Sequence, residues 1–367
     1  MKIQSISFKN NVSGWSIDSL LLQNLSLFVG ASGVGKTQIL NAITTLKDIA
    51  LGASRNGVEW EVRFEQESKS YVWVGAFASN NNDDVRFFEE RKPSPILFET
   101  LVCEDVVIVN RDKDSIYYSG ERTVKLDVNK SVVYLLKEEL PIAPIYSAFK
   151  LVYWLKTEDR GIRIPGKQKE ENDVVKDVKY LRNHRFFSPV EKLFLLKQNN
   201  QPEFKEIEDE FISFFPMVEN LDFAIETLYD GRNVPVLILK EKNINAWIPQ
   251  NNISSGMFRS LVQIIELALA RDGDVILIDE FENGLGVNCI NRLAEMILYP
   301  EHDIQFLITS HHPYIINNIP YSAWKIVTRS GSKVSVSSAE NLHIGSHSSH
   351  DAFMQLIQTS AYRNGSL

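Results

Sequence analysis

The stretch NLSLFVGASGVGKTQIL, residues 24–40, decides the fold of this 367-residue chain. Its first half contains a short apolar run, LSLFV at 25–29, that is typical of a buried strand. From Thr37 onward, apolar residues recur at three- and four-residue spacing, which predicts a helix over 37–49. Three glycines separate the two segments, so the stretch predicts a strand, a tight loop and a helix in direct succession.

The loop matches the pattern G-x-x-x-x-G-K-[ST] in full, with residues Gly30, Ala31, Ser32, Gly33, Val34, Gly35, Lys36 and Thr37. Glycines allow the backbone to wrap so that successive N–H groups point at phosphate oxygens, and the helix N-terminus adds positive potential. Lys36 is expected to reach the β- and γ-phosphates, and the Thr37 hydroxyl to ligate Mg²⁺. The sequence therefore predicts a site for the phosphates of a nucleotide.

Hydrolysis needs a further carboxylate near Mg²⁺ and a group that orients water. Asp279 and Glu280 follow four apolar residues, 275–278, so both acids are expected at the C-terminal tip of a buried strand. We expect Asp279 to bind the metal and Glu280 to polarise the attacking water.

Two further motifs flank this acidic pair. Ser254, Ser255 and Gly256 open a helix about twenty residues before Asp279, where a helix N-terminus attracts anions, although an ordinary helix cap explains the same residues. The loop ITSHHPY, residues 308–314, follows the next strand and carries His311, which is expected to contact the γ-phosphate.

With these four motifs in this order, the chain resembles ABC-type ATPase heads of the SMC, RecF and OLD group. It is most similar to small prokaryotic AAA-type ATP-binding proteins of phage-defence and abortive-infection systems. The resemblance implies that residues 30–37 are the Walker A loop, Asp279 and Glu280 the Walker B pair, and His311 the switch histidine. It also places Ser254, Ser255 and Gly256 at the signature motif, with catalytic roles for Glu280 and His311.

The resemblance implies a Mg²⁺-dependent ATPase that binds ATP between two copies of the chain, as a homodimer or higher oligomer. Residues 282–285, Glu-Asn-Gly-Leu, lie at the D-loop position, but Gly286-Val287 replaces the His-Pro usual in relatives. Longer relatives carry a coiled coil or a Toprim nuclease domain, and neither pattern is present here. A separate effector protein, a nuclease or Toprim-like protein, is therefore expected to be the partner.

The rest of the chain predicts how these motifs are connected. The opening IQSISF alternates like an edge strand, 58–77 has the pattern of a β-hairpin, and 131–215 is helical in texture, including YSAFKLVYWLK. We predict an α/β fold of the ABC-ATPase-head type, a mixed β layer plus a parallel core sheet with an inserted helical lobe. The predicted boundaries are 1–130 and 222–340 for the ATPase core, 131–221 for the lobe and 341–367 for a C-terminal tail helix.

The amino-acid composition limits which classes of partner the chain is expected to bind. The chain has 39 basic and 47 acidic residues, a net charge of −8, which argues against a chain-wide nucleic-acid surface. A DNA-repair or DNA-binding clamp of the RecF or SMC kind remains the alternative function, with the basic stripe Lys176, Lys179, Arg182 and Arg185 as its candidate surface. Two distant cysteines and no long apolar run predict a cytoplasmic protein without a membrane partner.

Overall fold

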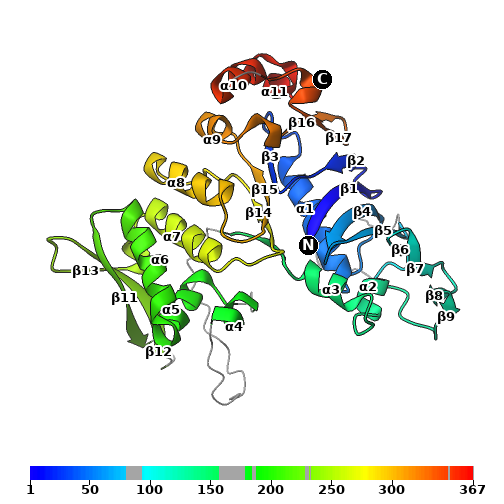
Figure 1. Cartoon of the computed structure of the whole chain (residues 1–367), viewed down its shortest axis with the longest axis horizontal. Coiled ribbons are helices and arrows are strands. Elements are labelled where there is room, and N and C mark those ends of the chain that lie inside the picture. Colours follow the sequence, from blue (N-terminus) through cyan, green and yellow to red (C-terminus); the bar gives the residue numbers. More distant parts are fainter. Residues whose placement is uncertain are drawn as a thin grey trace. The chain divides into compact units, whose positions relative to one another are not determined.

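The computed structural model describes residues 1–79, 93–156, 178–183, 187–227, 231, 233–345 and 348–366. The chain forms two compact units. The first comprises residues 1–154, 273–281 and 303–367, and the second comprises residues 155–272 and 282–302. Figure 1 shows the elements of both units along the chain.

A parallel group of strands forms one side of the first unit's sheet. Five strands lie side by side in the order β10 (Val152–Trp154), β14 (Val275–Ile278), β15 (Gln305–Thr309), β3 (Leu25–Val29) and β16 (Trp324–Ser330). Each neighbouring pair among them is parallel. The C-terminal ends of β14, β15 and β3 therefore meet at one edge of the sheet, which is where ligands bind in open α/β sheets.

An antiparallel layer continues the same sheet. It begins at β17 (Lys333–Ser338), which pairs antiparallel with β16 and parallel with β2 (Ser16–Leu21). The following strands are β1 (Lys2–Asn10), β4 (Val58–Gln66), β5 (Lys69–Phe77), β6 (Ile96–Cys103), β7 (Val106–Arg111), β8 (Ile116–Tyr118) and β9 (Glu121–Arg122). The predicted hairpin at 58–77 is present as β4 and β5.

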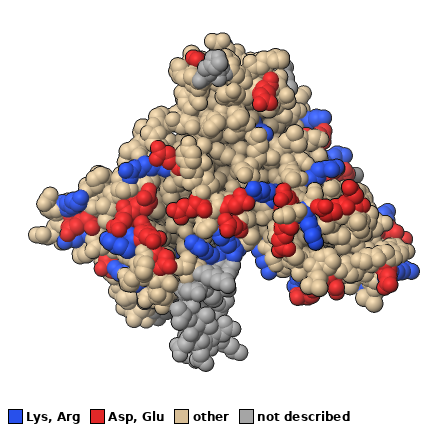
Figure 2. Space-filling model, in the orientation of Figure 1, with Lys and Arg blue, Asp and Glu red and all other residues tan. Residues whose placement is uncertain are grey.

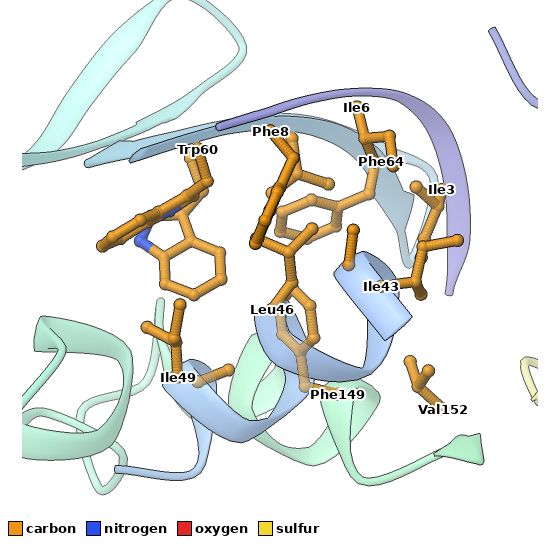
Figure 3. Packing of buried hydrophobic residues seen from close by; sticks show 14 of the residues in the cluster. Ile3, Ile6, Phe8, Ile43, Leu46, Ile49, Trp60, Phe64, Phe149 and Val152 are labelled. Carbon is orange, nitrogen blue, oxygen red and sulfur yellow. The ribbon is translucent and has the colours of Figure 1, made fainter. Parts of the chain in front are cut away.

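Helix α1 (Lys36–Ala50) starts directly after the glycine loop and packs on this sheet. Its buried residues recur at helical spacing, so one side of the helix is apolar. Figure 3 shows Ile43, Leu46 and Ile49 of α1 facing Phe8 of β1 and Trp60 and Phe64 of β4. Each fully buried aliphatic side chain stabilises the fold by about 1.5–3 kcal/mol, which fixes α1 and the loop before it to the sheet.

The remaining helices of the first unit are short. Within the residues that the structure describes, two precede β10, and three follow β15 together with two 3₁₀ turns. Their bounds are α2 (Val132–Leu135), α3 (Ala143–Phe149), α9 (Pro313–Asn318), η2 (Tyr321–Ala323), η3 (Glu340–Leu342), α10 (Ser349–Gln358) and α11 (Ser360–Asn364).

The second unit combines helices with its own small sheet. Its antiparallel strands are β11 (Val218–Thr227), β12 (Asn233–Glu241) and β13 (Trp247–Pro249). Its helices are α4 (Val178–Asn183), α5 (Pro189–Asn199), α6 (Gln201–Phe214), η1 (Gln250–Asn252), α7 (Ser255–Ala268) and α8 (Val287–Leu298). Helices α5 and α6 pack on β12 and β11, and on α7.

These observations confirm the predicted α/β class with a mixed β layer and a parallel core sheet. Two local predictions were wrong. The opening strand is not at an edge, because β1 lies between β2 and β4. The segment YSAFKLVYWLK is not one helix, because α3 ends at Phe149 and β10 pairs with β14.

The compact units also differ from the predicted boundaries. Residues 131–154 stay with the first unit, where a buried carboxylate holds the start of α2: Glu99 accepts hydrogen bonds from the Ser131 hydroxyl at 2.5 Å and from the Val132 N–H at 2.9 Å. Burial raises the pKa of Glu99, while these donors and the nearby Arg111 oppose that change. Residues 222–272 lie in the second unit, because β11 and β12 pack on α5 and α6.

Candidate nucleotide-binding site

The glycine loop connects β3 to α1, as the sequence predicts. Gly30, Gly33 and Gly35 have φ angles of 147°, 81° and 107°, a region that side-chain-bearing residues rarely adopt. At Gly30 a Cβ would also lie 2.5 Å from the carbonyl oxygen of Val327 in β16. The loop can therefore take this path only with glycine at these positions.

Two side chains of the loop carry its chemistry. The Lys36 ammonium is buried and donates hydrogen bonds to the carbonyl oxygens of Gly30, at 2.9 Å, and Ala31, at 2.8 Å. The charge is thus held inside the curve of the loop, next to the N-terminus of α1. The adjacent Thr37 is exposed, and its hydroxyl lies 2.9 Å from Oδ2 and 3.2 Å from Oδ1 of Asp279.

Asp279 and Glu280 follow β14 at the same sheet edge. Asp279 Oδ1 accepts a hydrogen bond of 2.6 Å from the Thr309 hydroxyl at the end of β15. The same hydroxyl accepts a 2.8 Å hydrogen bond from the Glu280 backbone N–H. Thr309 thus holds both acids from the neighbouring strand.

Glu280 has an unusual backbone. Its φ angle is 47°, in the left-handed region, which costs a non-glycine residue about 1–2 kcal/mol. Such strain persists where the surroundings determine the conformation, and it gathers at functional sites. In this conformation Glu280 is exposed, and it directly follows the half-buried Asp279.

The two histidines of the loop after β15 differ in their surroundings. His312 caps α9, because its Nδ1 accepts a hydrogen bond from the Tyr314 N–H at 3.3 Å. His311 is half-buried and lies one residue after Ser310, whose N–H donates to the Phe28 carbonyl oxygen of β3 at 3.3 Å. His311 therefore belongs to the sheet edge that carries the glycine loop, while His312 has a structural task.

The predicted signature residues lie in the second unit. Ser254 is the N-cap of α7, and its hydroxyl accepts the Met257 N–H at 3.3 Å, which is the ordinary cap considered above. Gly256 allows close packing, because a Cβ there would lie 3.3 Å from the Gly284 carbonyl oxygen. Arg259, one turn along α7, donates to the Asn283 carbonyl and side-chain oxygens at 2.7 and 3.0 Å. Residues 254–259 and 283–284 thus form one packed structure.

An open pocket of about 430 Å³ lies beside α1 in the first unit. Trp15 and Gln38 form the end of the pocket next to Gly35. Among the described residues, the indole N–H of the buried Trp15 has no hydrogen-bond partner. The lining combines apolar side chains with amides, hydroxyls and a guanidinium: Phe8, Asn10, Val12, Ser13, Trp15, Gln38, Asn41, Ala42, Thr45, Arg55, Asn56 and Val58.

The oxygen donors at the sheet edge fit a magnesium ion. Mg²⁺ prefers oxygen ligands and is usually held by one or two protein groups together with phosphate oxygens and water. The Thr37 hydroxyl and the Asp279 carboxylate are adjacent oxygen donors beside the glycine loop. They are the residues that would hold the ion.

Comparison with known proteins places the chain in a family. Residues 116–317, more than half of the chain, match the family model described as "AAA domain, putative AbiEii toxin, Type IV TA system". The chain belongs to this family. The match covers Asp279, Glu280, Ser254 and His311, while the glycine loop precedes it. It confirms the resemblance predicted from the four motifs, and the chain is a P-loop NTPase domain.

Solved structures of SMC heads are similar to the chain at low identity. The SMC head bound to the C-winged helix domain of ScpA is 14% identical over 92% of this chain and 97% of that chain, with a TM-score of 0.48. The Smc head domain with an extended coiled coil bound to the C-terminal domain of ScpA, from Pyrococcus furiosus, is 14% identical. The similarity covers 93% of this chain and 98% of that chain, with a TM-score of 0.47. The SMC head domain from Thermotoga maritima is 12% identical over 92% of this chain and 99% of that chain, with a TM-score of 0.43. No curated protein matches the sequence significantly.

Sequence reasoning missed Thr309, which has no motif of its own, although its place at the end of the strand before His311 was a usable signal. It also missed the pocket at Trp15.

Of the predicted basic stripe, Lys176 and Arg185 lie outside the described residues, as does the side chain of Lys179. In the described part of the chain, no helix is long and apolar enough to cross a membrane.

Proposed function

We propose that the protein is a Mg²⁺-dependent ATPase of the cytoplasm whose ATP-driven dimerisation controls a separate effector protein in defence against phage. The proposed ATPase activity rests on one observation, the hydrogen bond between Thr37 and Asp279, which are 242 residues apart in sequence. It brings the phosphate loop and the acidic pair to one sheet edge.

Each group has a distinct task in hydrolysis. The backbone N–H groups of residues 30–37 and the Lys36 ammonium bind the β- and γ-phosphates. Thr37 and Asp279 would hold Mg²⁺, which would supply positive charge to the phosphate oxygens. Glu280 accepts a proton from water as the water oxygen bonds to the γ-phosphorus and the bond to ADP breaks. His311 donates a hydrogen bond to the γ-phosphate.

The pocket beside α1 accommodates the nucleoside. Its position supports this, because Gln38 follows Thr37 directly and the pocket lining continues along α1 from there to Thr45. ATP should therefore bind more tightly than tripolyphosphate, and Asn41→Trp, which fills the pocket, should abolish that difference. Equal affinities for the two ligands in the unchanged protein would remove this part of the proposal.

The second half of each site comes from another copy of the chain. Ser254, Ser255 and Gly256 form an exposed to half-exposed helix start, and such a helix start attracts anions. In the proposed dimer they contact the γ-phosphate held by the partner's phosphate loop. ATP is then part of the interface, and hydrolysis releases it.

The biological part of the proposal rests on the family. Its description names a putative toxin of a toxin–antitoxin system, which supports a role in abortive infection. A nuclease or Toprim-like protein is the proposed effector.

Turnover of ATP by the purified protein tests the enzymatic proposal. Phosphate release should require Mg²⁺, and Lys36→Ala should abolish ATP binding, because it removes the buried charge inside the loop. Binding of ATP by Lys36→Ala with unchanged affinity would refute the site.

The DNA-clamp alternative makes a different prediction. On the face that Figure 2 shows, the described acidic and basic side chains are interspersed. A clamp would bind duplex DNA with affinity that falls steeply as salt increases, because bound cations are released from the phosphates. We expect no such binding at physiological salt.

A further inference from the structure

The C-terminal end of the described chain packs on the phosphate loop. Gly365, which follows α11, is buried and has a φ angle of 68°. A Cβ at this position would overlap Cγ1 of Val34 and lie 3.5 Å from Cβ of Ala31. The backbone of the chain end therefore packs directly against the loop at Val34.

Val34 is the anchor of this contact. Among residues 31–37 only Val34 and Lys36 have buried side chains. The other Val34 methyl group, Cγ2, lies 3.5 Å from the place of a Cβ on Gly30. The Val34 side chain thus lies beside Gly30 at the start of the loop and beside Gly365 at the chain end.

Strand β16 joins the two segments. The Arg329 N–H donates to the Gly365 carbonyl oxygen at 2.8 Å, and the Arg329 guanidinium lies 3.4 Å from the Gly33 carbonyl oxygen. Helix α10, which leads to α11, packs against α9, the helix that begins after His311. The top of Figure 1 shows α10 and α11 beside α9 and β16.

We propose that residues 359–366 hold residues 31–34 in the phosphate-binding conformation, with Gly365 as a positioning residue for nucleotide binding. This inference rests on the proposed nucleotide site. The loop binds phosphate through backbone N–H groups, whose directions depend on the loop conformation. Support from the chain end keeps these groups aimed before the nucleotide arrives, which increases affinity.

Gly365→Ala tests the inference, with Gly120→Ala as its matched control. Both glycines have left-handed φ angles, 68° and 86°, but a Cβ on Gly120 has nothing within 4 Å. Both variants therefore place a side chain on a left-handed residue, and only the Cβ of Gly365→Ala overlaps Val34. We expect the overlap with Val34 in Gly365→Ala to increase the KM for ATP about tenfold, while kcat at saturating ATP changes less than about twofold. Gly120→Ala should leave both constants unchanged.

Hydrogen exchange on the nucleotide-free protein gives a readout that does not depend on catalysis. The amides of residues 31–35 should exchange faster in Gly365→Ala than in Gly120→Ala. The increase in KM should be much smaller when Gly365→Ala is made in a Val34→Ala background, because Cγ1 is then absent.

Equal KM values for the Gly365 and Gly120 variants would overturn the inference, as would faster exchange without an increase in KM. If the unchanged protein bound no ATP at all, the proposed function itself would fail. If it bound ATP and the two glycine variants matched it, only the positioning role would fail.

Discussion

Thr309→Val tests how the catalytic pair is held. Thr309 is 1% exposed and makes two hydrogen bonds with its hydroxyl, to Asp279 at 2.6 Å and from the Glu280 N–H at 2.8 Å. Valine has nearly the same shape, so the packing of β15 against β3 and β14 is kept. The substitution removes only the hydroxyl that fixes the two acids.

The structure sets the expected magnitude. A hydrogen bond to a charged group contributes about 1.5–3 kcal/mol, and about 1.4 kcal/mol corresponds to a tenfold change in rate. If these hydrogen bonds hold Asp279 and Glu280 in position in the transition state, their loss should decrease kcat roughly 10- to 100-fold. The KM for ATP should change little, because Lys36 and the loop amides are untouched.

The assay is steady-state phosphate release over a range of ATP concentrations, with Thr309→Ser as the control. Serine keeps the hydroxyl, so its kcat should stay within about threefold of the unchanged protein. A valine variant with unchanged kcat, or a serine variant as slow as the valine variant, would refute the role given to this hydroxyl.

Two further predictions concern the metal and the composite site. Asp279→Asn removes one negative charge from the Mg²⁺ site beside Thr37, so the Mg²⁺ concentration needed for half-maximal turnover should rise at least about tenfold; an unchanged Mg²⁺ dependence would move the metal ligand elsewhere. Ser254→Arg should bind ATP normally but lose ATP-driven association, and mixing it with Lys36→Ala chains should restore some hydrolysis through one complete site per heterodimer. Absence of rescue on mixing, measured by turnover, would leave a helix cap as the better explanation of Ser254.

The core of the site could be predicted from sequence because its chemistry is local. The glycine loop needs glycines at fixed spacing, and the acidic pair follows a strand that is apolar throughout. Both patterns can be recognised without knowing what packs against them. The structure then places Thr37 and Asp279 within hydrogen-bond distance.

The parts that sequence reasoning missed depend on distant partners. Residues 152–154 form a strand only because residues 275–277 lie beside them, and a three-residue strand has too little pattern to outweigh the helical spacing around it. The opening strand alternates as an edge strand does, and pairs with the adjacent β2 on one side, but its other side pairs with β4, which comes much later in the chain. The contact between Gly365 and Val34 joins residues with no shared pattern.

The mass of Glu280→Gln in solution tests the central claim most directly. The amide keeps the shape of the side chain but cannot accept the proton from water, so ATP should stay bound in the composite sites. Light scattering should show a mass of one chain without nucleotide and twice that mass with ATP and Mg²⁺. A mass that is the same with and without ATP would contradict the account.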